Sequence, residues 1–235
     1  MIGTYEVFTR VDGKSDSDEI LSILADISTG RRKNDLKLVN YYQEMPISYG
    51  SVKIDDCSGG ALELTVHQNQ IVVVGHQKQT ILKSKHFPDG LSVHAIAESI
   101  NIKKCYVVLG RFAYASIKAD RRSAIRVRMP GSIPITFKTD STTYSGMLVD
   151  ISVSGVKVKD SDLPSCPVNG ILGIPLLGDK VSLPGTFIRE KISANGHFHA
   201  FTIEPDTNTE VAISKIIYSR QIEIIQMLKD QVLLD

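Results

Sequence analysis

The fold is indicated most clearly by residues 146–159, GMLVDISVSGVKVK. Two runs in this stretch, 146–151 and 155–159, have the composition of strands, and Gly155 marks a turn between them. Because side chains alternate along a strand, Asp150 and Ser152 are expected to project from the same face. The stretch therefore predicts two neighbouring strands with polar groups beside their turn.

Four further strand-like runs lie close to this stretch, with turn residues between them. They are Ile133–Lys138, Ile171–Leu176, Pro184–Ile192 and Phe198–Ile203. Six short strands at this spacing predict a small β-barrel. Residues Asn208–Leu233 have helical spacing and a broad apolar stripe. They predict a C-terminal helix that either packs within the chain or supports a homodimer.

The N-terminal half has its own strand-like runs and one helical segment. Asp16 and Glu19 stand three apart, as in a capping box, and open a helix that Gly30 ends. The runs with strand composition are Leu36–Tyr42, Ser51–Ile54, Ala61–His67, Ile71–Val74, Leu91–Ile100 and Cys105–Tyr114. The short polar segment His67–Gln70 predicts a hairpin between the third and fourth of these runs. A small β-barrel with one early helix is therefore expected.

The composition changes abruptly at Lys118, where apolar strand residues give way to a charged segment before Pro130 and Gly131. This change predicts an interdomain joint, with one domain at residues 1–118 and another at 119–235. A chain of 235 residues is long enough for each half to bury its own core. The expected fold class is mainly β, with an N-terminal split barrel, a C-terminal six-stranded barrel and a closing α-helix.

Four arginines lie between the joint and the next predicted strand: Arg121, Arg122, Arg126 and Arg128. A guanidinium group can hold phosphate oxygens in a bidentate manner and can lie flat on a purine, which a lysine ammonium cannot do. Clustered arginines also occur on solvated surfaces and in interdomain salt bridges. Considered alone, the cluster leaves an anion site and a solvated surface both open.

Asp150, Ser152 and Gly155 have the chemistry for reading a guanine. A carboxylate can accept both the ring N–H and the exocyclic amine of that base, and a hydroxyl can contact base or phosphate. Glycine lets a ligand approach the backbone closely. The alternative for these residues is a turn that the Asp or Ser side chain stabilises without any ligand.

The two elements together form a far more specific pattern than either one. R-x-x-x-R is followed about two dozen residues later by D-x-S-x-x-G, across one predicted barrel strand. In this respect the sequence resembles the PilZ domain family of cyclic-di-GMP receptors. Arg122 and Arg126 match the two motif arginines, and Asp150, Ser152 and Gly155 match the second motif.

The resemblance covers Ala119 to about Asp206. The helix predicted at Asn208–Leu233 is similar to an extension that follows the barrel in some members. The N-terminal half is similar in outline to the accessory domain of YcgR-type flagellar-brake proteins, a split barrel related to flavin-binding folds.

The resemblance implies a receptor for cyclic-di-GMP and no enzyme, without catalytic residues, metal or cofactor. Arg122 and Arg126 would clamp phosphates and stack on guanine. Asp150 and Ser152 would read the base edges, and Gly155 would shape the turn. Charge-assisted contacts contribute roughly 1.5–3 kcal/mol each, so a handful supports an affinity on the order of micromolar or better.

Arg121 stands immediately before the first motif arginine. In this family, an arginine at that position accompanies the binding of two stacked ligand copies. Because the arginines lie on the joint, ligand binding is expected to draw the linker against the barrel and reorient the N-terminal domain. The resemblance further implies control of motility or a related surface behaviour, through the flagellar motor or another protein target. Recruitment from the cytoplasm to the flagellar basal body would follow.

The composition favours a cytoplasmic protein without membrane insertion. The formal charge of +1 provides no global field toward nucleic acid or an anionic membrane. The N-terminus does not pair a basic region with a long apolar run, and no apolar stretch has the length to span a bilayer. Cys57, Cys105 and Cys166 lack C-x-x-C spacing, which suits reduced thiols.

Three other interpretations of the sequence concern a flavin site, a nucleic-acid site and a metal site. A flavin-binding split barrel would make the protein an oxidoreductase, which a yellow colour on purification would reveal. A barrel for single-stranded nucleic acid would interleave aromatics with basic residues, but aromatics are 6% of this chain and Trp is absent. His197 and His199 would share a strand face, yet a third metal ligand with suitable spacing is not evident.

Overall fold

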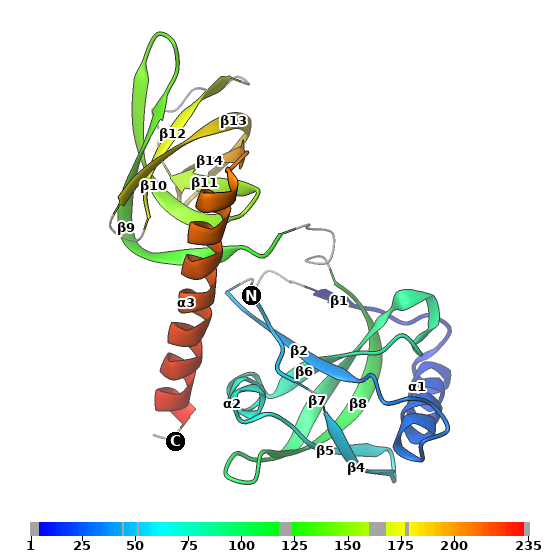
Figure 1. Ribbon diagram of the computed structural model, residues 1–235. Helices are drawn as coiled ribbons and strands as arrows, with labels where there is room; N and C mark the ends of the chain where they lie inside the picture. Colours follow the sequence, from blue (N-terminus) through cyan, green and yellow to red (C-terminus); the bar gives the residue numbers. More distant parts are fainter. Residues whose placement is uncertain are drawn as a thin grey trace. The chain divides into compact units, whose positions relative to one another are not determined.

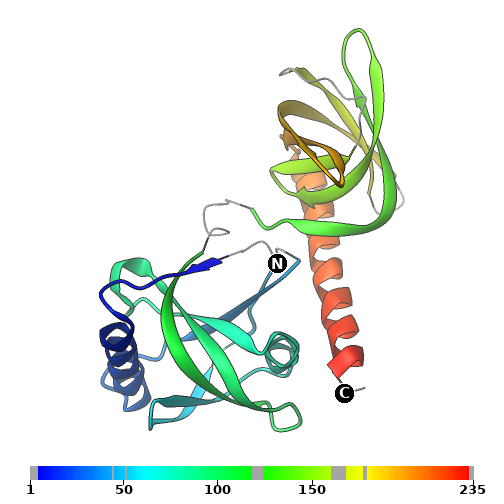
Figure 2. The ribbon, with the colours of Figure 1, turned by 180° about the vertical axis from the view of Figure 1, so that it is seen from behind.

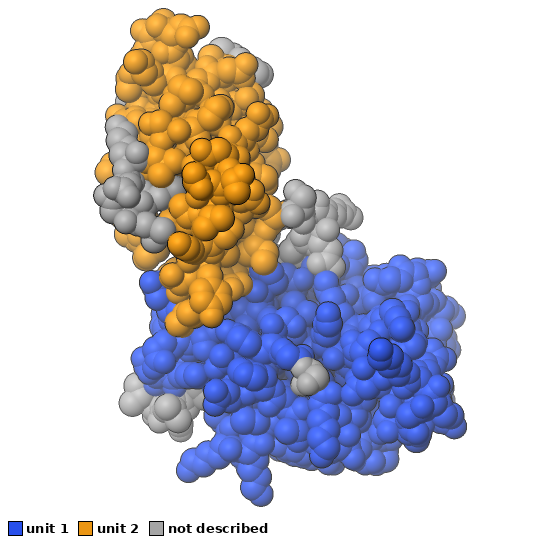
Figure 3. All heavy atoms as spheres, in the orientation of Figure 1, with its two compact units in different colours: residues 1–42, 46–122, 223–235 blue, residues 43–45, 123–222 orange. Residues whose placement is uncertain are grey.

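The computed structural model of the chain (Figure 1) describes residues 5–43, 45–50, 52–117, 124–159, 168–176 and 179–232. The chain divides into two compact units, coloured separately in Figure 3. The first unit comprises residues 1–42, 46–122 and 223–235, and the second comprises residues 43–45 and 123–222.

An eight-stranded antiparallel sheet forms the framework of the N-terminal half. Its strands are β1 (Tyr5–Val7), β2 (Lys37–Tyr42), β3 (Met45–Ile47), β4 (Lys53–Ser58), β5 (Ala61–Thr65), β6 (Gln79–Lys83), β7 (Ser92–Asn101) and β8 (Tyr106–Ile117). The strand order is β3-β2-β6-β7-β8-β5-β4, and β1 pairs with β8. Two helices, α1 (Gly13–Ser28) and α2 (Gln68–Gln77), and the short 3₁₀ helix η1 (Pro88–Gly90) complete the described elements.

Helix α1 begins at Gly13, so the predicted start at Asp16 is wrong. The side chain of Asp12 caps the helix by accepting from the backbone N–H groups of Lys14 and Ser15, at 3.0 and 2.9 Å. Asp16 lies inside the helix, where its carboxylate accepts from the backbone N–H groups of Arg10 and Val11. The carboxylate expected to open the helix therefore fixes the chain that enters it.

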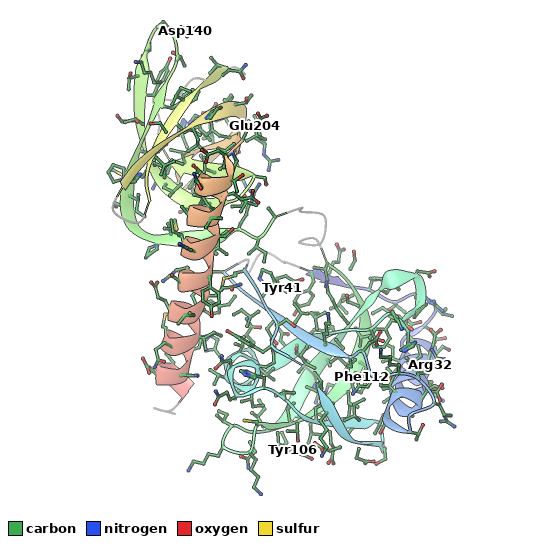
Figure 4. All side chains as sticks on the ribbon, viewed as in Figure 1. Arg32, Tyr41, Tyr106, Phe112, Asp140 and Glu204 are labelled. Carbon is green, nitrogen blue, oxygen red and sulfur yellow. The ribbon has the colours of Figure 1, made fainter. Side chains whose placement is uncertain are left out.

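The apolar face of α1 packs into the main core of the sheet. Ile20 and Leu24 are fully buried in it, together with Leu109 and Phe112 of β8. Figure 4 labels Phe112 among these side chains. Burial of such side chains is the dominant favourable contribution to folding of a small domain.

The predicted strand at Ile71–Val74 and its hairpin with residues 61–67 are wrong, because residues 68–77 form helix α2. Ile71, Val73 and Val74 are fully buried, and Val72 is nearly so. A β-branched run that is buried on all sides has the same composition as a central strand. The polar residues of the helix distinguish it from such a strand, and their hydrogen-bond partners lie far away in the sequence.

Asn40 of β2 is the centre of this polar network. Its side-chain N–H groups donate to the side chain of Gln77 at 2.9 Å and to the carbonyl of Gln79 at 2.7 Å. Its side-chain oxygen accepts from Gln70 at 2.7 Å and from the hydroxyl of Thr80 at 2.9 Å. Asn40, Gln70 and Thr80 are all buried. Four hydrogen bonds on one buried amide therefore fix α2 against β2 and β6.

Six antiparallel strands of the second unit pair in a closed ring, as predicted. They are β9 (Val127–Lys138), β10 (Thr143–Ser152), β11 (Gly155–Lys159), β12 (Asn169–Leu176), β13 (Asp179–Ser193) and β14 (Gly196–Ile203). The pairing runs β10-β11-β14-β13-β12-β9 and returns from β9 to β10. Figure 2 shows these strands from behind. The predicted C-terminal helix is confirmed as α3 (Thr207–Val232).

The barrel core is lined by the residues that alternate inward. Phe137, Phe187 and Phe201 pack together, with ring centroids of Phe137 and Phe201 4.8 Å apart.

Among the described residues, no helix is long and apolar enough to cross a membrane.

Candidate functional site

Three neighbouring barrel strands, β9, β10 and β11, place Arg128 and Asp150 on the outer wall, and the hairpin of β10 and β11 carries Ser152 and Gly155. Val127, Ile151 and Val156 are buried and point into the barrel. Because side chains alternate along a strand, Arg128, next to Val127, and Asp150, next to Ile151, face outward.

The strand register brings opposite charges into one row. Arg128 of β9 lies directly opposite Asp150 of β10, and Asp150 lies opposite Lys157 of β11. Neighbouring strands are about 4.8 Å apart, so the carboxylate has a cation on each side. The register shifts between Leu148 and Asp150, where β9 and β10 are irregular.

The hairpin between β10 and β11 turns at Val153 and Ser154, and Ser152 pairs with Gly155 across it. The hydroxyl of Ser152 is fully buried and donates to the carbonyl of Gly155 at 3.1 Å. Ser152 thus stabilises the turn.

Gly155 is required by close packing and not by its backbone conformation. Its φ is outside the left-handed region, and residues 153 and 154 form the turn. A Cβ at this position would lie 2.8 Å from the backbone oxygen of Phe201 and 4.0 Å from Nη2 of Arg126. The absence of a side chain therefore lets β14 and the Arg126 guanidinium approach the hairpin.

A surface pocket lies beside the hairpin. Its barrel lining comprises Arg126, Arg128, Val149, Asp150, Lys157 and Phe198. Three cations and one carboxylate give this lining an excess of positive charge. Nζ of Lys157 lies 4.6 Å from the ring centroid of Phe198. Such a lining combines cations suited to phosphate oxygens with a carboxylate suited to the N–H edge of a base.

The structure therefore brings Arg126, Asp150 and Gly155 together, with Ser152 at the end of β10 beside the turn. Arg121 and Arg122 lie outside the described residues, so their placement stays a prediction. In the described part of the chain, no group of three or more His, Cys, Asp or Glu residues could hold a metal ion.

Two lining residues, Lys157 and Phe198, were missed by the sequence reasoning. Lys157 could have been predicted from the sequence. It stands two positions after Gly155 on a predicted strand, so the two residues lie on the same face of that strand. The sequence around Phe198 does not indicate that this residue belongs to the site. It is more than forty residues from the hairpin, and only the pairing of β11 with β14 brings it near.

Solved structures that are similar to this chain include three that cover 80% or more of it. MrkH from K. pneumonia in complex with c-di-GMP is 11% identical, with 95% of this chain and 99% of that chain covered and a TM-score of 0.42. YcgR from Escherichia coli in complex with c-di-GMP is 12% identical, with coverage of 94% and 99% and a TM-score of 0.41. The Bacillus subtilis inhibitor of motility MotI/DgrA is 11% identical, with coverage of 80% and 96% and a TM-score of 0.39.

A comparison with curated protein sequences finds no match. The family comparison is specific to the second half of the chain. Residues 120–219 match the family described as PilZ domain, and this range contains the whole six-stranded ring together with both predicted motifs. Residues 120–219 of this chain are a PilZ domain.

Proposed function

We propose that the protein is a receptor for cyclic-di-GMP. The observation that carries the proposal is the pocket of the PilZ domain, which Arg126, Arg128 and Lys157 line together with Asp150. This set of groups fits a ligand that has both phosphates and a guanine. Binding requires no bond to be broken, so the proposed role is recognition without catalysis.

Each motif residue has a role that follows from its chemistry. The guanidinium of Arg126 binds phosphate and stacks on the base. The carboxylate of Asp150 accepts the ring N–H and the exocyclic amine of guanine. Ser152 and Gly155 hold the hairpin that carries Asp150. Arg122, four residues before Arg126 in the chain, supplies the second motif guanidinium.

Calorimetric titration of cyclic-di-GMP tests this assignment. Arg126→Ala and Asp150→Ala are each expected to weaken binding roughly 10- to 100-fold, because each removes a charge-assisted contact of about 1.5–3 kcal/mol. The wild type is expected to bind at micromolar concentration or below.

Two matched substitutions control for charge alone. Lys138 is exposed at the other end of β9, and Asp140 is exposed in the turn between β9 and β10, where Figure 4 labels it. Lys138→Ala and Asp140→Ala are expected to bind as the wild type does. Absence of heat from the wild type at high micromolar ligand would contradict the receptor assignment.

Two stacked ligand copies per chain are proposed, because Arg121 precedes the first motif arginine. The stoichiometry of the same titration measures this directly. A wild-type stoichiometry of one would contradict it.

We also propose a two-domain organisation, at 1–118 and 119–235, in which the ligand changes the relative orientation of the domains. Arg121 and the motif arginine Arg122 lie at this joint in the sequence, so a ligand held by them and by Asp150 would link the joint to the barrel. The small-angle scattering profile is expected to change when cyclic-di-GMP is added, and Asp150→Ala is expected to abolish the change. Superimposable wild-type profiles would contradict the switch.

The downstream process proposed is motility or a related surface behaviour, with the protein acting from the cytoplasm on the flagellar motor or another protein. Swimming speed of cells that produce the wild type or Asp150→Ala tests this link. Equal speeds at high cyclic-di-GMP would remove motility from the proposal.

A further inference from the structure

Lys157 completes the row of charges on the outer wall of the barrel. It lies directly opposite Asp150, on the side away from Arg128, and it lines the same pocket. Its neighbours Val156 and Val158 are buried, so the lysine side chain faces outward with the motif residues. Lys157 is thus placed by the ladder of β10 and β11, which fixes its spacing from Asp150.

The Lys157 ammonium lies over the ring of Phe198 in a cation–π contact. Lys157 pairs with Ala200 of β14, so Phe198 is its diagonal neighbour on the same face of the sheet. Nζ lies 4.6 Å from the ring centroid, within the range of a cation–π contact. Both residues are half-buried and both line the pocket. This contact limits the conformations available to a side chain that is otherwise flexible.

The ammonium group has capacity for another partner. In the described ranges of the chain, the Lys157 side chain forms no salt bridge and no hydrogen bond. Its three N–H donors face a pocket in which cations outnumber carboxylates. An ammonium is a compact point charge that binds phosphate well, although it cannot read a base edge as a carboxylate does.

We propose that Lys157 binds a phosphate of the cyclic dinucleotide and that Phe198 positions its ammonium for this contact. The inference rests on the proposed function. It adds to the ligand site a cation, Lys157, that belongs to neither motif. The ligand group concerned is the phosphodiester. The competing explanation is that the pair only stabilises the barrel wall, and the dependence of affinity on salt separates the two.

The first test compares Lys157→Met with the wild type in cyclic-di-GMP titrations at several salt concentrations. Methionine keeps the apolar stem and removes the charge. We expect binding about 10-fold weaker at low salt and a shallower decrease of affinity with salt, because one phosphate contact is lost. Lys157→Arg, which retains the charge, is expected to bind within about 3-fold of the wild type.

Lys191→Met is the matched control, because Lys191 is exposed on β13 and does not line the pocket. It is expected to match the wild type in affinity and in salt dependence. An unchanged affinity of Lys157→Met would overturn the inference. So would weaker binding with the salt dependence of the wild type, since that is the result of a purely structural role.

The role of Phe198 is tested by placing Phe198→Leu in both backgrounds. We expect binding about 3-fold weaker in the wild-type background and no further loss in Lys157→Met, because the ring acts through the ammonium. Phe198→Tyr keeps the ring and is expected to bind as the wild type does. An equal loss in both backgrounds would overturn the positioning role.

The two proposals fail in different ways. If the wild type itself does not bind cyclic-di-GMP, the receptor assignment fails and the role of Lys157 fails with it. If the wild type binds and Asp150→Ala does not, while Lys157→Met is indistinguishable from the wild type, only the inference about Lys157 fails. Thermal unfolding of each variant checks that the barrel is intact.

Discussion

Asn40→Ala is expected to lower the free energy of unfolding by about 3 kcal/mol, because several buried polar groups lose their partner together. The alanine removes four hydrogen bonds at once. Gln70 is fully buried and cannot turn to water for a replacement. Each buried group left without a partner costs about 1–3 kcal/mol, although local rearrangement offsets part of the sum. Urea unfolding followed by circular dichroism measures the difference.

Gln68→Ala is the matched control for this substitution. Gln68 is exposed in the first turn of α2, next to the network in sequence but outside it. Its replacement is expected to change the stability by no more than about 0.5 kcal/mol. If Asn40→Ala were as stable as Gln68→Ala, the network would not be what fixes α2 to the sheet.

Gly155→Ala is expected to lower both the stability of the barrel and the affinity for cyclic-di-GMP. The new methyl group would lie 2.8 Å from the backbone oxygen of Phe201, so β11 or β14 must shift. Forcing an extra carbon into a packed site costs about 1–3 kcal/mol. The shift also displaces the Arg126 guanidinium, which lies near the same position, and we expect affinity to fall more than about 10-fold. Thermal unfolding and calorimetry measure the two effects.

Gly13→Ala provides the comparison for an added methyl group. Gly13 is the first residue of α1, and a Cβ there would meet no atom within 4 Å. Because alanine favours helix, this variant is expected to be as stable as the wild type or slightly more stable. A Gly155→Ala protein with wild-type stability and affinity would show that the close approach of β14 is not needed.

The barrel strands could be predicted because each alternates on its own, so that local sequence carries the information. The start of β9 was missed for a local reason. Pro130 and Gly131 have the composition of a turn, and the prediction began the strand at Ile133. In the structure β9 starts at Val127, and residues 129–132 have no partner in its ladder with β10. An irregular strand tolerates proline and glycine, which a regular central strand does not.

The N-terminal half was harder to predict because its decisive contacts are non-local. Helix α2 has the β-branched composition of a strand, and Gln70 and Gln77 join it to the sheet through hydrogen bonds to Asn40. Strand β6 went unrecognised next to it. Hydrogen bonds that join residues 30 or more positions apart leave no periodic signal in the sequence.

The candidate site, too, could be predicted from the sequence only where its residues are close together in the chain. Asp150 and Gly155 belong to one hairpin, so their short spacing in the sequence was enough to find them. The cross-strand position of Arg128 and the contact between Lys157 and Phe198 depend on which strands are neighbours in the ring. That order is a property of the folded barrel and not of any single segment.

The open strand order of the N-terminal sheet bears on how the protein avoids aggregation. The order ends at β3 and at β4, where an incoming strand from another molecule could pair. Strand β3 has three residues, and Pro46 at its centre offers no N–H for such pairing. Strand β4 exposes Asp55 and Asp56, and Asp56 already faces the like charge of Glu63. Both ends of the sheet are therefore poor templates for intermolecular growth, which matters for a chain whose net charge of +1 gives little repulsion between copies.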